Sequence, residues 1–321
     1  MAAQPVGPAE PLRSDDARWT YRYLRIAMVG AVVLLAASIA IERSKVNCWQ
    51  TSISAYYYTP VRAIFVGTLI AVALALIAYK GKGAWEDLIL NLAGMLAPVV
   101  AVAPTTDVGR CWSIPPIPLP VKDDGSLAEW VVANIDNNIY ALLIAGLLGL
   151  AISAIIAMIN RVSNRSNQRV MAPIKIERTT QIGLGLTALV LASGWWLMRN
   201  WDDFDTEAHG YAAVLMFVFL IGAVVANVLE NWRKRRKERR HKVWSWVYMV
   251  VAALMVLGAL VIWLTRIFGE HTVFALEAYE IGWFALYWSA QTAENWFEKV
   301  ETERSGSDTL AEDAASTQPS A

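Results

Sequence analysis

The chain has 321 residues, of which 56% are hydrophobic and 17% are charged, and 28 lysine and arginine residues balance 28 aspartate and glutamate residues. Soluble globular proteins carry about 25% charged and roughly 45–50% apolar residues, so this composition excludes the soluble class. A net charge of zero also argues against nucleic-acid binding, which needs a basic surface. The sequence therefore predicts an integral membrane protein with no nucleic-acid partner.

Eight apolar stretches are long enough for membrane-spanning helices, which need about 20 mostly apolar residues. The predicted spans are Leu24–Ile41, Pro60–Tyr79, Leu88–Ala103, Ile139–Ile159, Thr180–Met198, Tyr211–Leu229, Val243–Leu264 and Thr272–Thr292. We expect a kink in the third span because it contains Pro98. The predicted fold is an all-α integral membrane helical bundle of about eight transmembrane helices over residues 23–296.

The distribution of basic residues predicts the orientation of this bundle. Lysine and arginine near the ends of spans are held on the cytoplasmic side of a membrane. If both termini are inside, the inner segments hold 21 basic residues and the outer segments hold 7. The basic run at 233–242 then serves as a topology determinant, although it could also attract anionic lipids. We therefore expect a multi-pass protein with its N-terminus and C-terminus in the cytoplasm.

The outer loops contain both cysteines of the chain. Cys48 and Cys111 fall on the oxidising face, which favours a disulfide between the first two outer loops over two unrelated buried thiols. In the loop 105–138, Ser126 stands three residues before Glu129, a capping-box spacing. This spacing predicts a short helix that lies on the outer membrane surface.

Three further patterns concern the ends of the chain and its packing. Residues 1–22 and 297–321 are polar and lack apolar periodicity, so we expect both segments to be disordered and cytoplasmic. Ala141, Ala145 and Gly149 recur every four positions, which allows close helix approach in lipid. Packing within the chain is the preferred interpretation, with a homo-oligomer or another membrane protein as the alternative partner.

A set of polar residues is predicted at one depth near the outer head groups, where ionisable side chains are costly and tend to be functional or paired. The set includes Arg62, Tyr57, His209 and Glu277. One hypothesis is an outer-leaflet pocket in which Arg62 takes an anionic group, Tyr57 and His209 donate hydrogen bonds, and Glu277 orients Arg62. The competing hypothesis is an ion pair between Arg62 and Glu277 that only packs two helices.

A catalytic role for the same residues is less well supported than a binding pocket. A hydrolase could use His209, Asp107 and Glu277, either as zinc ligands together with His271 or beside a nucleophilic Ser52 or Ser54. Only three histidines are present, without a two-histidine helical spacing, and there is no nucleophile elbow, phosphate loop or Rossmann fingerprint. We therefore expect no catalytic residue, no metal and no cofactor.

The third functional hypothesis is a small-solute transporter. Transporters usually show a polar site near the middle of the membrane and an internal repeat. Glu280 is the one candidate proton-relay carboxylate, and Tyr287 and Gln291 continue along its face towards the inside. No convincing repeat relates the two halves, so we interpret this stripe as packing against neighbouring spans.

Several motifs resemble a family of bacterial multi-pass membrane proteins that has no known activity. The main one is Ser52-Ile53-Ser54-Ala55-Tyr56-Tyr57-Tyr58-Thr59-Pro60-Val61-Arg62, followed by Phe65-Val66-Gly67. Other matches are Asn91-Leu92-Ala93-Gly94, Pro104-Thr105, His209 and Phe274-Ala275-Leu276-Glu277, which together extend the likeness over half of the chain. The family has about six spans, so the fourth and fifth spans resemble an inserted pair, and Ala63 replaces its usual acidic residue. The resemblance implies a bacterial cell membrane.

These observations favour a membrane protein without catalytic activity of its own. We expect a binding or accessory subunit with an outer-leaflet polar pocket for a lipid or an anionic ligand. Membrane lipids are its expected partners, together with a membrane protein partner or a second copy of the chain. The alternatives are a membrane-embedded lipid-processing hydrolase and a small-solute transporter.

Overall fold

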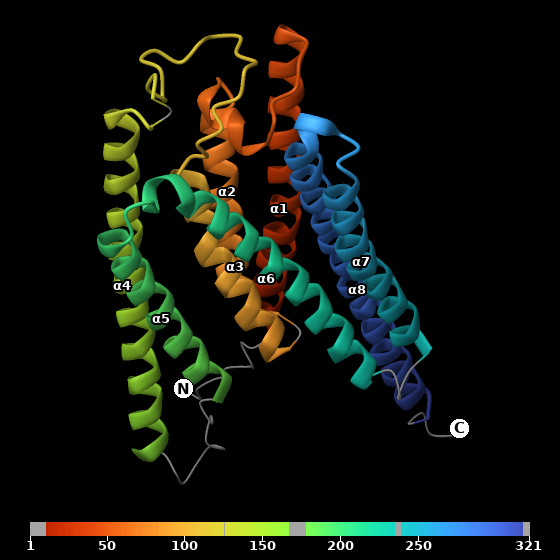
Figure 1. The fold of residues 1–321 in the computed structure, drawn as a ribbon. Coiled ribbons are helices and arrows are strands. Elements are labelled where there is room, and N and C mark those ends of the chain that lie inside the picture. Colours follow the sequence, from red (N-terminus) through yellow and green to blue (C-terminus); the bar gives the residue numbers. More distant parts are fainter. Residues whose placement is uncertain (1–10, 82, 125, 167–177, 235–238, 317–321) are drawn as a thin grey trace, which may run out of the picture.

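The computed structural model describes residues 11–81, 83–124, 126–166, 178–234 and 239–316 (Figure 1). These residues form an all-helical fold without a β-strand, so the predicted all-α class is confirmed. The helices are α1 (Pro11–Val46), η1 (Ser54–Tyr58), α2 (Arg62–Ala78), α3 (Ala84–Val102), α4 (Glu129–Ser166), α5 (Arg178–Asn200), α6 (Phe204–Lys234), α7 (Arg239–Thr265), η2 (Gly269–His271) and α8 (Thr272–Ser316).

Six of these helices are long and apolar enough to cross a membrane, as expected for a multi-pass membrane protein. The apolar stretches are Trp19–Val46, Ala84–Val102, Glu129–Ile159, Gln181–Asn200, Phe204–Trp232 and Val243–Thr265. The other two predicted spans correspond to α2, an apolar helix of 17 residues, and to α8, whose first turns carry Glu277 and Glu280. The predicted total of eight therefore exceeds the six that length and composition support.

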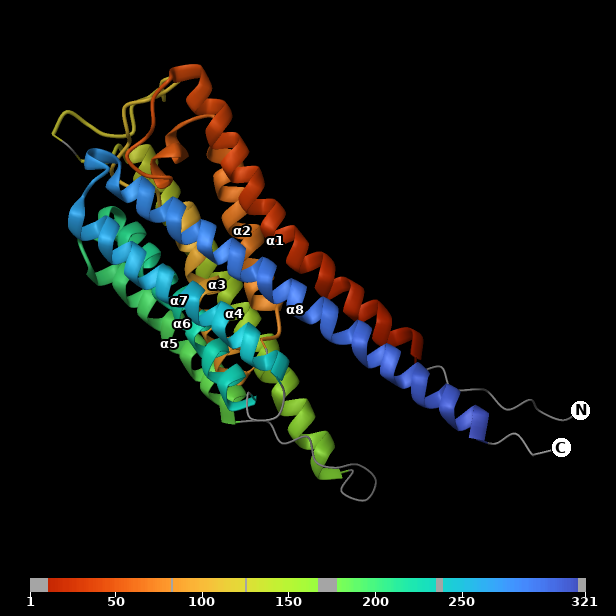
Figure 2. The same ribbon diagram turned by 90° about the vertical axis from the view of Figure 1, so that its right-hand side faces the viewer.

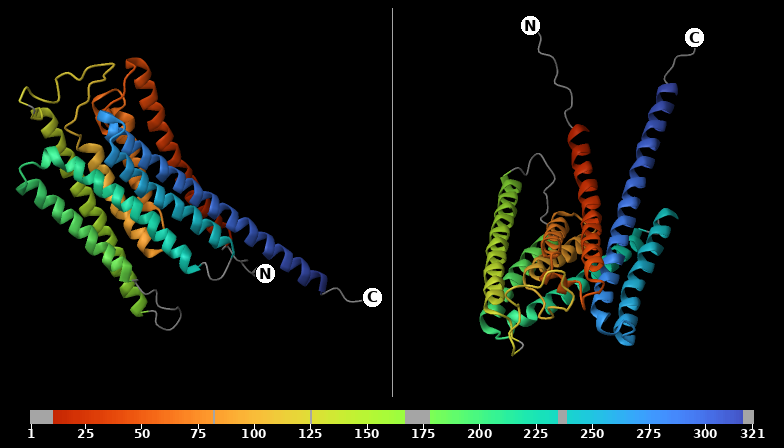
Figure 3. Two further views of the ribbon diagram at one scale, coloured as in Figure 1. Left: turned by 45° about the vertical axis from the view of Figure 1, so that its right-hand side comes forward. Right: turned by 90° about the horizontal axis from the view of Figure 1, so that it is seen from above.

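The bundle is built around α3, which packs against α2 and α6 (Figure 1). Helix α1 contacts α2 and α8, and α7 contacts α6 and α8, which closes this group of six helices around one apolar core. Helices α4 and α5 pack on each other and on α3 at the edge of the molecule (Figure 3). Helices α1 and α8 lie side by side over part of their length, and the start of α1 and the end of α8 lie towards the same end of the bundle (Figure 2).

The segment expected to form a separate surface helix instead forms the first turns of α4, which begins at Glu129 and continues into the apolar stretch. The predicted capping box is absent because Ser126 has another partner: its backbone N and its Oγ donate to Asp124 Oδ1 at 2.9 and 2.6 Å. These two hydrogen bonds hold the pKa of Asp124 below its usual value. The loop 105–128 therefore ends in a tight turn directly before α4.

Helix covers parts of both terminal segments that were expected to be disordered. Helix α1 begins at Pro11 and α8 ends at Ser316, while residues 1–10 and 317–321 lie outside the described part of the chain. Alanine, glutamate, lysine and arginine favour helix without any apolar periodicity, and the tail beyond residue 296 is rich in alanine and glutamate. The structure thus has helix at 11–22 and 297–316, and the cytoplasmic side of both segments stays a prediction.

The small-residue stripe of α4 does not pack within the chain, so the preferred interpretation of it was wrong. Ala141, Ala145 and Gly149 are exposed, and no atom lies within 4 Å of a side chain added at Gly149. Helix α5 approaches a different face of α4, where the side chain of Leu191 lies against Gly146. The alternative, that the stripe packs against a second copy of the chain or another membrane protein, stays a prediction.

Candidate functional site

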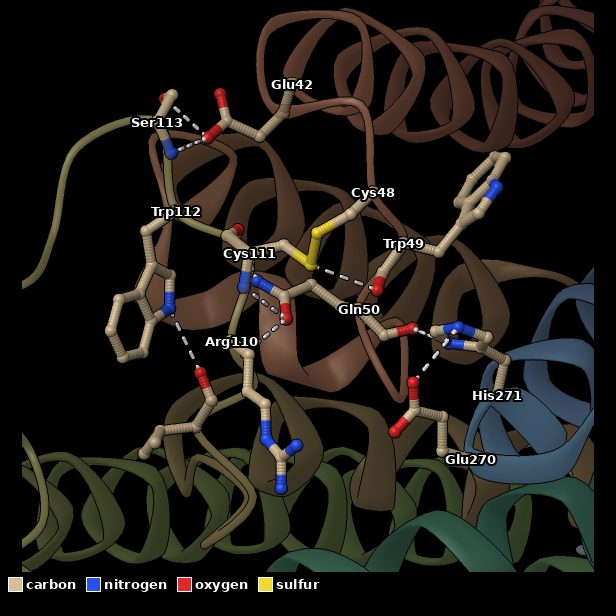
Figure 4. Close-up of a disulfide and its surroundings, with 11 residues drawn as sticks. Glu42, Cys48, Trp49, Gln50, Arg110, Cys111, Trp112, Ser113, Glu270 and His271 are labelled. Carbon is tan, nitrogen blue, oxygen red and sulfur yellow. Dashed lines mark hydrogen bonds and ion pairs between the residues drawn. A yellow bond between two sulfur atoms is a disulfide. The ribbon is translucent and has the colours of Figure 1, made fainter.

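The loop after α1 and the loop after α3 are joined by a disulfide, as predicted from the two cysteines (Figure 4). Cys48 and Cys111 have Cα atoms 6.0 Å apart, and the bond closes a loop over a sequence separation of 63 residues. In the chain-entropy model, closing a loop of this length contributes about 4 kcal/mol to stability. The disulfide thereby fixes the segment 47–61, which carries the tyrosine-rich η1, against the loop that follows α3.

Polar contacts around the disulfide hold the same two loops together (Figure 4). Gln50 is buried; its Nε2 donates to Cys111 O at 2.6 Å, and its Oε1 accepts from Arg110 N at 3.1 Å. Glu42, at the outer end of α1, accepts from both the backbone N and the Oγ of Ser113, at 3.1 and 2.5 Å. These contacts could not be predicted because they join residues that are 60 or more positions apart.

Arg62 and Tyr57 lie together at a pocket near the N-terminal end of α2. Arg62 Nη2 donates to the Tyr57 hydroxyl at 2.6 Å, and the guanidinium lies 4.3 Å from the centre of the Tyr57 ring. The pocket has a volume of about 670 Å³ and lies between η1, α2, the end of α3 and the start of α4. Its lining residues are Tyr57, Thr59, Pro60, Arg62, Ala63, Val66, Gly67, Ala101, Val102 and Asn138.

The guanidinium of Arg62 is exposed, and no acidic side chain in the described part of the chain pairs with it. Ala63 is the next residue in the chain, and the pocket wall that continues from Arg62 is apolar. The predicted contact with Glu277 is not formed, because the Glu277 carboxylate is bound by the loop before η1. Arg62 therefore offers a positive charge to the pocket, with only the neutral Tyr57 to position it.

His209 and Glu277 belong to a different site, where a single serine joins them. His209 lies in α6, and its Nε2 is 2.8 Å from Ser54 Oγ, while its Nδ1 is 2.6 Å from Ala103 O. Glu277 Oε1 is 3.1 Å from the same Ser54 Oγ, and its Oε2 accepts from Ile53 N at 2.6 Å. We call His209, Ser54 and Glu277 the outer network; it connects η1, α6 and α8.

The hydrogen bonds of the outer network determine how many protons it holds. The Ala103 carbonyl can only accept, so Nδ1 of His209 carries a hydrogen. Two arrangements of hydrogens satisfy these contacts. In the first, a protonated Glu277 donates to Ser54, and Ser54 donates to Nε2 of His209. In the second, a protonated Nε2 donates to Ser54, and Ser54 donates to the Glu277 carboxylate. A neutral imidazole beside an ionised Glu277 would leave the one Ser54 hydrogen facing two acceptors. His209 and Glu277 thus share one proton.

The candidate catalytic residues are not assembled for hydrolysis. Asp107 is exposed and accepts from Gly109 N at 3.1 Å within its own turn, apart from the outer network. Glu277 contacts the serine, whereas a catalytic acid would contact the second histidine nitrogen, which here binds Ala103 O. His271 contacts Gln50 O at 3.1 Å, and no group of three metal-ligating side chains forms among the described residues.

A larger buried polar cluster lies at the opposite end of the bundle, where the sequence analysis placed no site. Glu86, in the first turn of α3, is 1% exposed, and its Oε1 accepts from Asn227 Nδ2, Tyr287 Oη and Gln291 Nε2 at 3.1, 2.8 and 2.7 Å. Asn231 Nδ2 donates to Asn227 Oδ1 at 2.7 Å. The carboxylate of Glu86 thereby joins α3, α6 and α8.

The same cluster extends to α1 and α7. Arg25 Nη1 donates to Gln291 Oε1 at 3.1 Å, and the guanidinium also contacts the Tyr79 hydroxyl and lies 4.5 Å from the centre of that ring. Tyr248, in α7, donates to Glu294 at 2.5 Å. We call this cluster the inner network; its members are Arg25, Tyr79, Glu86, Asn227, Asn231, Tyr248, Tyr287, Gln291 and Glu294. The sequence does contain a pattern that indicates this network. Asn227 with Asn231, and Tyr287 with Gln291, are polar pairs four residues apart within helices that are otherwise mostly apolar.

The chain was also compared with known proteins. No family model, no curated protein and no solved structure matches it.

Proposed function

We propose that the protein binds an anionic amphiphile, such as an acidic lipid, in the pocket beside Arg62. The observation that carries this proposal is an exposed guanidinium that has no acidic partner among the described residues and opens onto an apolar wall. A phosphate or carboxylate head group would form the charge-assisted hydrogen bonds that Arg62 lacks within the chain.

The remaining pocket walls suit the hydrocarbon part of such a ligand. Val66, Gly67, Ala101 and Val102 continue from Arg62 along the facing sides of α2 and α3. A volume of about 670 Å³ lies within the usual range of roughly 300–1,000 Å³ for small-molecule sites. Tyr57 positions the guanidinium, and Asn138 from α4 adds one polar group at the rim.

We further propose that all eight α-helices cross the cytoplasmic membrane of a bacterium, with both termini inside. Helix α2 would extend about 25 Å at 1.5 Å per residue, close to the thickness of a hydrocarbon core, and it contacts α1 and α3. Helix α8 contacts α1 and α7, and four of its polar side chains are buried in the bundle: Thr272, Glu280, Gln291 and Glu294. In this arrangement the Arg62 pocket opens towards the outer leaflet.

A hydrolase is less well supported than a binding protein. Ser54, the one serine in contact with a histidine here, is 4% exposed, and it does not line the pocket beside Arg62. A nucleophile needs access to its substrate, whereas Ser54 is enclosed between η1, α6 and α8. The outer network is therefore better suited to holding the helices and a proton than to attacking an ester.

Native mass spectrometry of the gently solubilised full-length protein tests the binding proposal. We expect acidic lipid to remain bound to the wild type and to be lost from Arg62→Ala, with partial retention in Arg62→Lys. Arg266→Ala is the matched control, because Arg266 is an exposed arginine at the outer end of α7 that stacks on Trp263. Equal lipid retention in Arg62→Ala and in the wild type would refute the proposal.

A further inference from the structure

The buried side chains of α8 form a stripe that runs along the helix. Positions 277, 280, 284, 287, 291 and 294 follow a spacing of three and four residues, which places them on one face. Five of these six positions are Glu, Tyr or Gln, and Phe284 is the exception. Glu277 belongs to the outer network, while Tyr287, Gln291 and Glu294 belong to the inner network. Glu280 lies between the two networks.

Glu280 is buried without a partner. Its side chain belongs to a residue that is 3% exposed, and neither carboxyl oxygen has a hydrogen-bond partner among the described residues. An isolated carboxylate in apolar surroundings costs far more free energy than the neutral acid. Packing alone would be served better by leucine or glutamine at this position. Glu280 is therefore an acid that the fold keeps away from any fixed counterion, and a proton is the ligand that it can take there.

The two networks supply groups that can exchange a proton with Glu280. Glu277 lies one turn towards the outer end, about 4.5 Å along the helix axis, and shares a proton with His209 through Ser54. Tyr287 lies about 10 Å further inward and donates to Glu86, whose carboxylate oxygen accepts three hydrogen bonds. Phe284 is buried between Glu280 and Tyr287 and separates them.

We propose that Glu280 is a membrane-embedded proton site that links the outer and inner networks into a proton path along α8. In each passage an O–H bond of Glu277 breaks as one forms on the Glu280 carboxylate, and that bond then breaks as the proton passes, by way of the Tyr287 hydroxyl, to an O–H bond on the Glu86 carboxylate. Glu277 regains a proton from the outer side, and Glu86 releases its proton to the inner side. No electron moves and no bond between heavy atoms changes, so one positive charge crosses per passage. Phe284 offers no polar group between Glu280 and Tyr287, so the passage between them requires a water molecule.

This path is independent of the ligand pocket, because Arg62 and Tyr57 contact neither Glu280 nor the inner network.

The test uses the full-length protein in liposomes that contain a pH-sensitive dye, with proton uptake driven by a potassium diffusion potential. We expect uptake in the wild type and its loss in Glu280→Gln, which keeps the shape of the side chain but cannot ionise. Glu270→Gln is the matched control, since Glu270 is an exposed glutamate just before α8, and it should retain wild-type uptake.

Two results would overturn the proposal: wild-type liposomes that take up protons no faster than protein-free liposomes, or Glu280→Gln liposomes that match the wild type. A second measurement avoids any question of folding in the variant. A hydrophobic carbodiimide reacts with protonated carboxyl groups in apolar surroundings, so peptide mapping of the treated wild type should show modification at Glu280 together with blocked uptake. Uptake that continues while Glu280 is modified would equally exclude Glu280 from the path.

Discussion

Two arginines of neighbouring helices, α1 and α2, have opposite environments. Arg25 is buried, and its guanidinium is satisfied by Gln291 and by the hydroxyl and ring of Tyr79. Arg62 is exposed and has Tyr57 as its partner. A satisfied, buried arginine holds helices together, whereas an exposed arginine beside an apolar wall has charge left for a ligand. Burial, rather than residue type, separates the structural arginine from the binding arginine.

One carboxyl oxygen of Glu86, Oε1, accepts hydrogen bonds from three side chains of the inner network. Replacing Glu86 by alanine would leave Asn227, Tyr287 and Gln291 with buried donors that no longer reach that acceptor. Each unsatisfied buried group costs about 1–3 kcal/mol, so we expect Glu86→Ala to lower the free energy of unfolding by about 3 kcal/mol or more. Thermal unfolding of the purified protein in micelles measures this change.

Glu129→Ala is the control for that comparison. Its carboxylate is 94% exposed and lies 3.6 Å from the ammonium of Lys122, an arrangement that contributes little to stability. The melting temperature of Glu129→Ala should match that of the wild type within experimental error. Equal melting temperatures for the two variants would show that the inner network does not stabilise the fold.

The tyrosine-rich segment before α2 has no long regular element of its own, and it is positioned by its attachments. The disulfide holds one end, Glu277 binds Ile53 N and Ser54 Oγ, and Phe274 N donates to Thr51 O at 2.9 Å. Burial of Tyr58 in this segment raises the pKa of its hydroxyl. The segment thus connects the start of α8 with the start of α2, and it places Tyr57 beside Arg62.

Helices α2 and α3 lie close together at Gly94. A Cβ atom at this position would lie 2.9 Å from Ala73 O and 2.9 Å from Ile77 Cγ1, so the backbone of α2 would have to move. We expect Gly94→Ala to destabilise the protein by about 1–3 kcal/mol, the usual cost of overpacking, although alanine favours helix. Thermal unfolding in micelles gives the size and the sign of the effect.

Gly149→Ala is the matched control, because a Cβ atom there meets no atom within 4 Å and the residue is exposed on α4. This variant should be neutral or should gain up to about 1 kcal/mol from helix propensity. The two glycines thus predict opposite signs for the same substitution. Stabilisation by Gly94→Ala would contradict the close contact between α2 and α3.

For the molecule as a whole, the apolar runs predicted the helices well and the buried contacts poorly. The predicted span Pro60–Tyr79 corresponds to α2 (Arg62–Ala78), because a long apolar run has few other structures available to it. The bridge from His209 to Glu277 could not be predicted, since it depends on where one serine in a loop is held. Glu86 was missed because it comes before the predicted span at Leu88 and so looked like a residue at the membrane surface.

The arrangement of the whole bundle makes a prediction about which residues face each side of the membrane. If α2 and α8 cross together with the six more apolar helices, Asp123 is outside while Lys80 and Ser307 are inside. The native cysteines are joined in a disulfide, so cysteines introduced at these three positions are the only thiols available to an impermeant maleimide. We expect Asp123→Cys to be labelled in intact cells, and Lys80→Cys and Ser307→Cys only after permeabilisation. Labelling of Lys80→Cys in intact cells would mean that α2 does not cross, and labelling of Ser307→Cys would mean the same for α8.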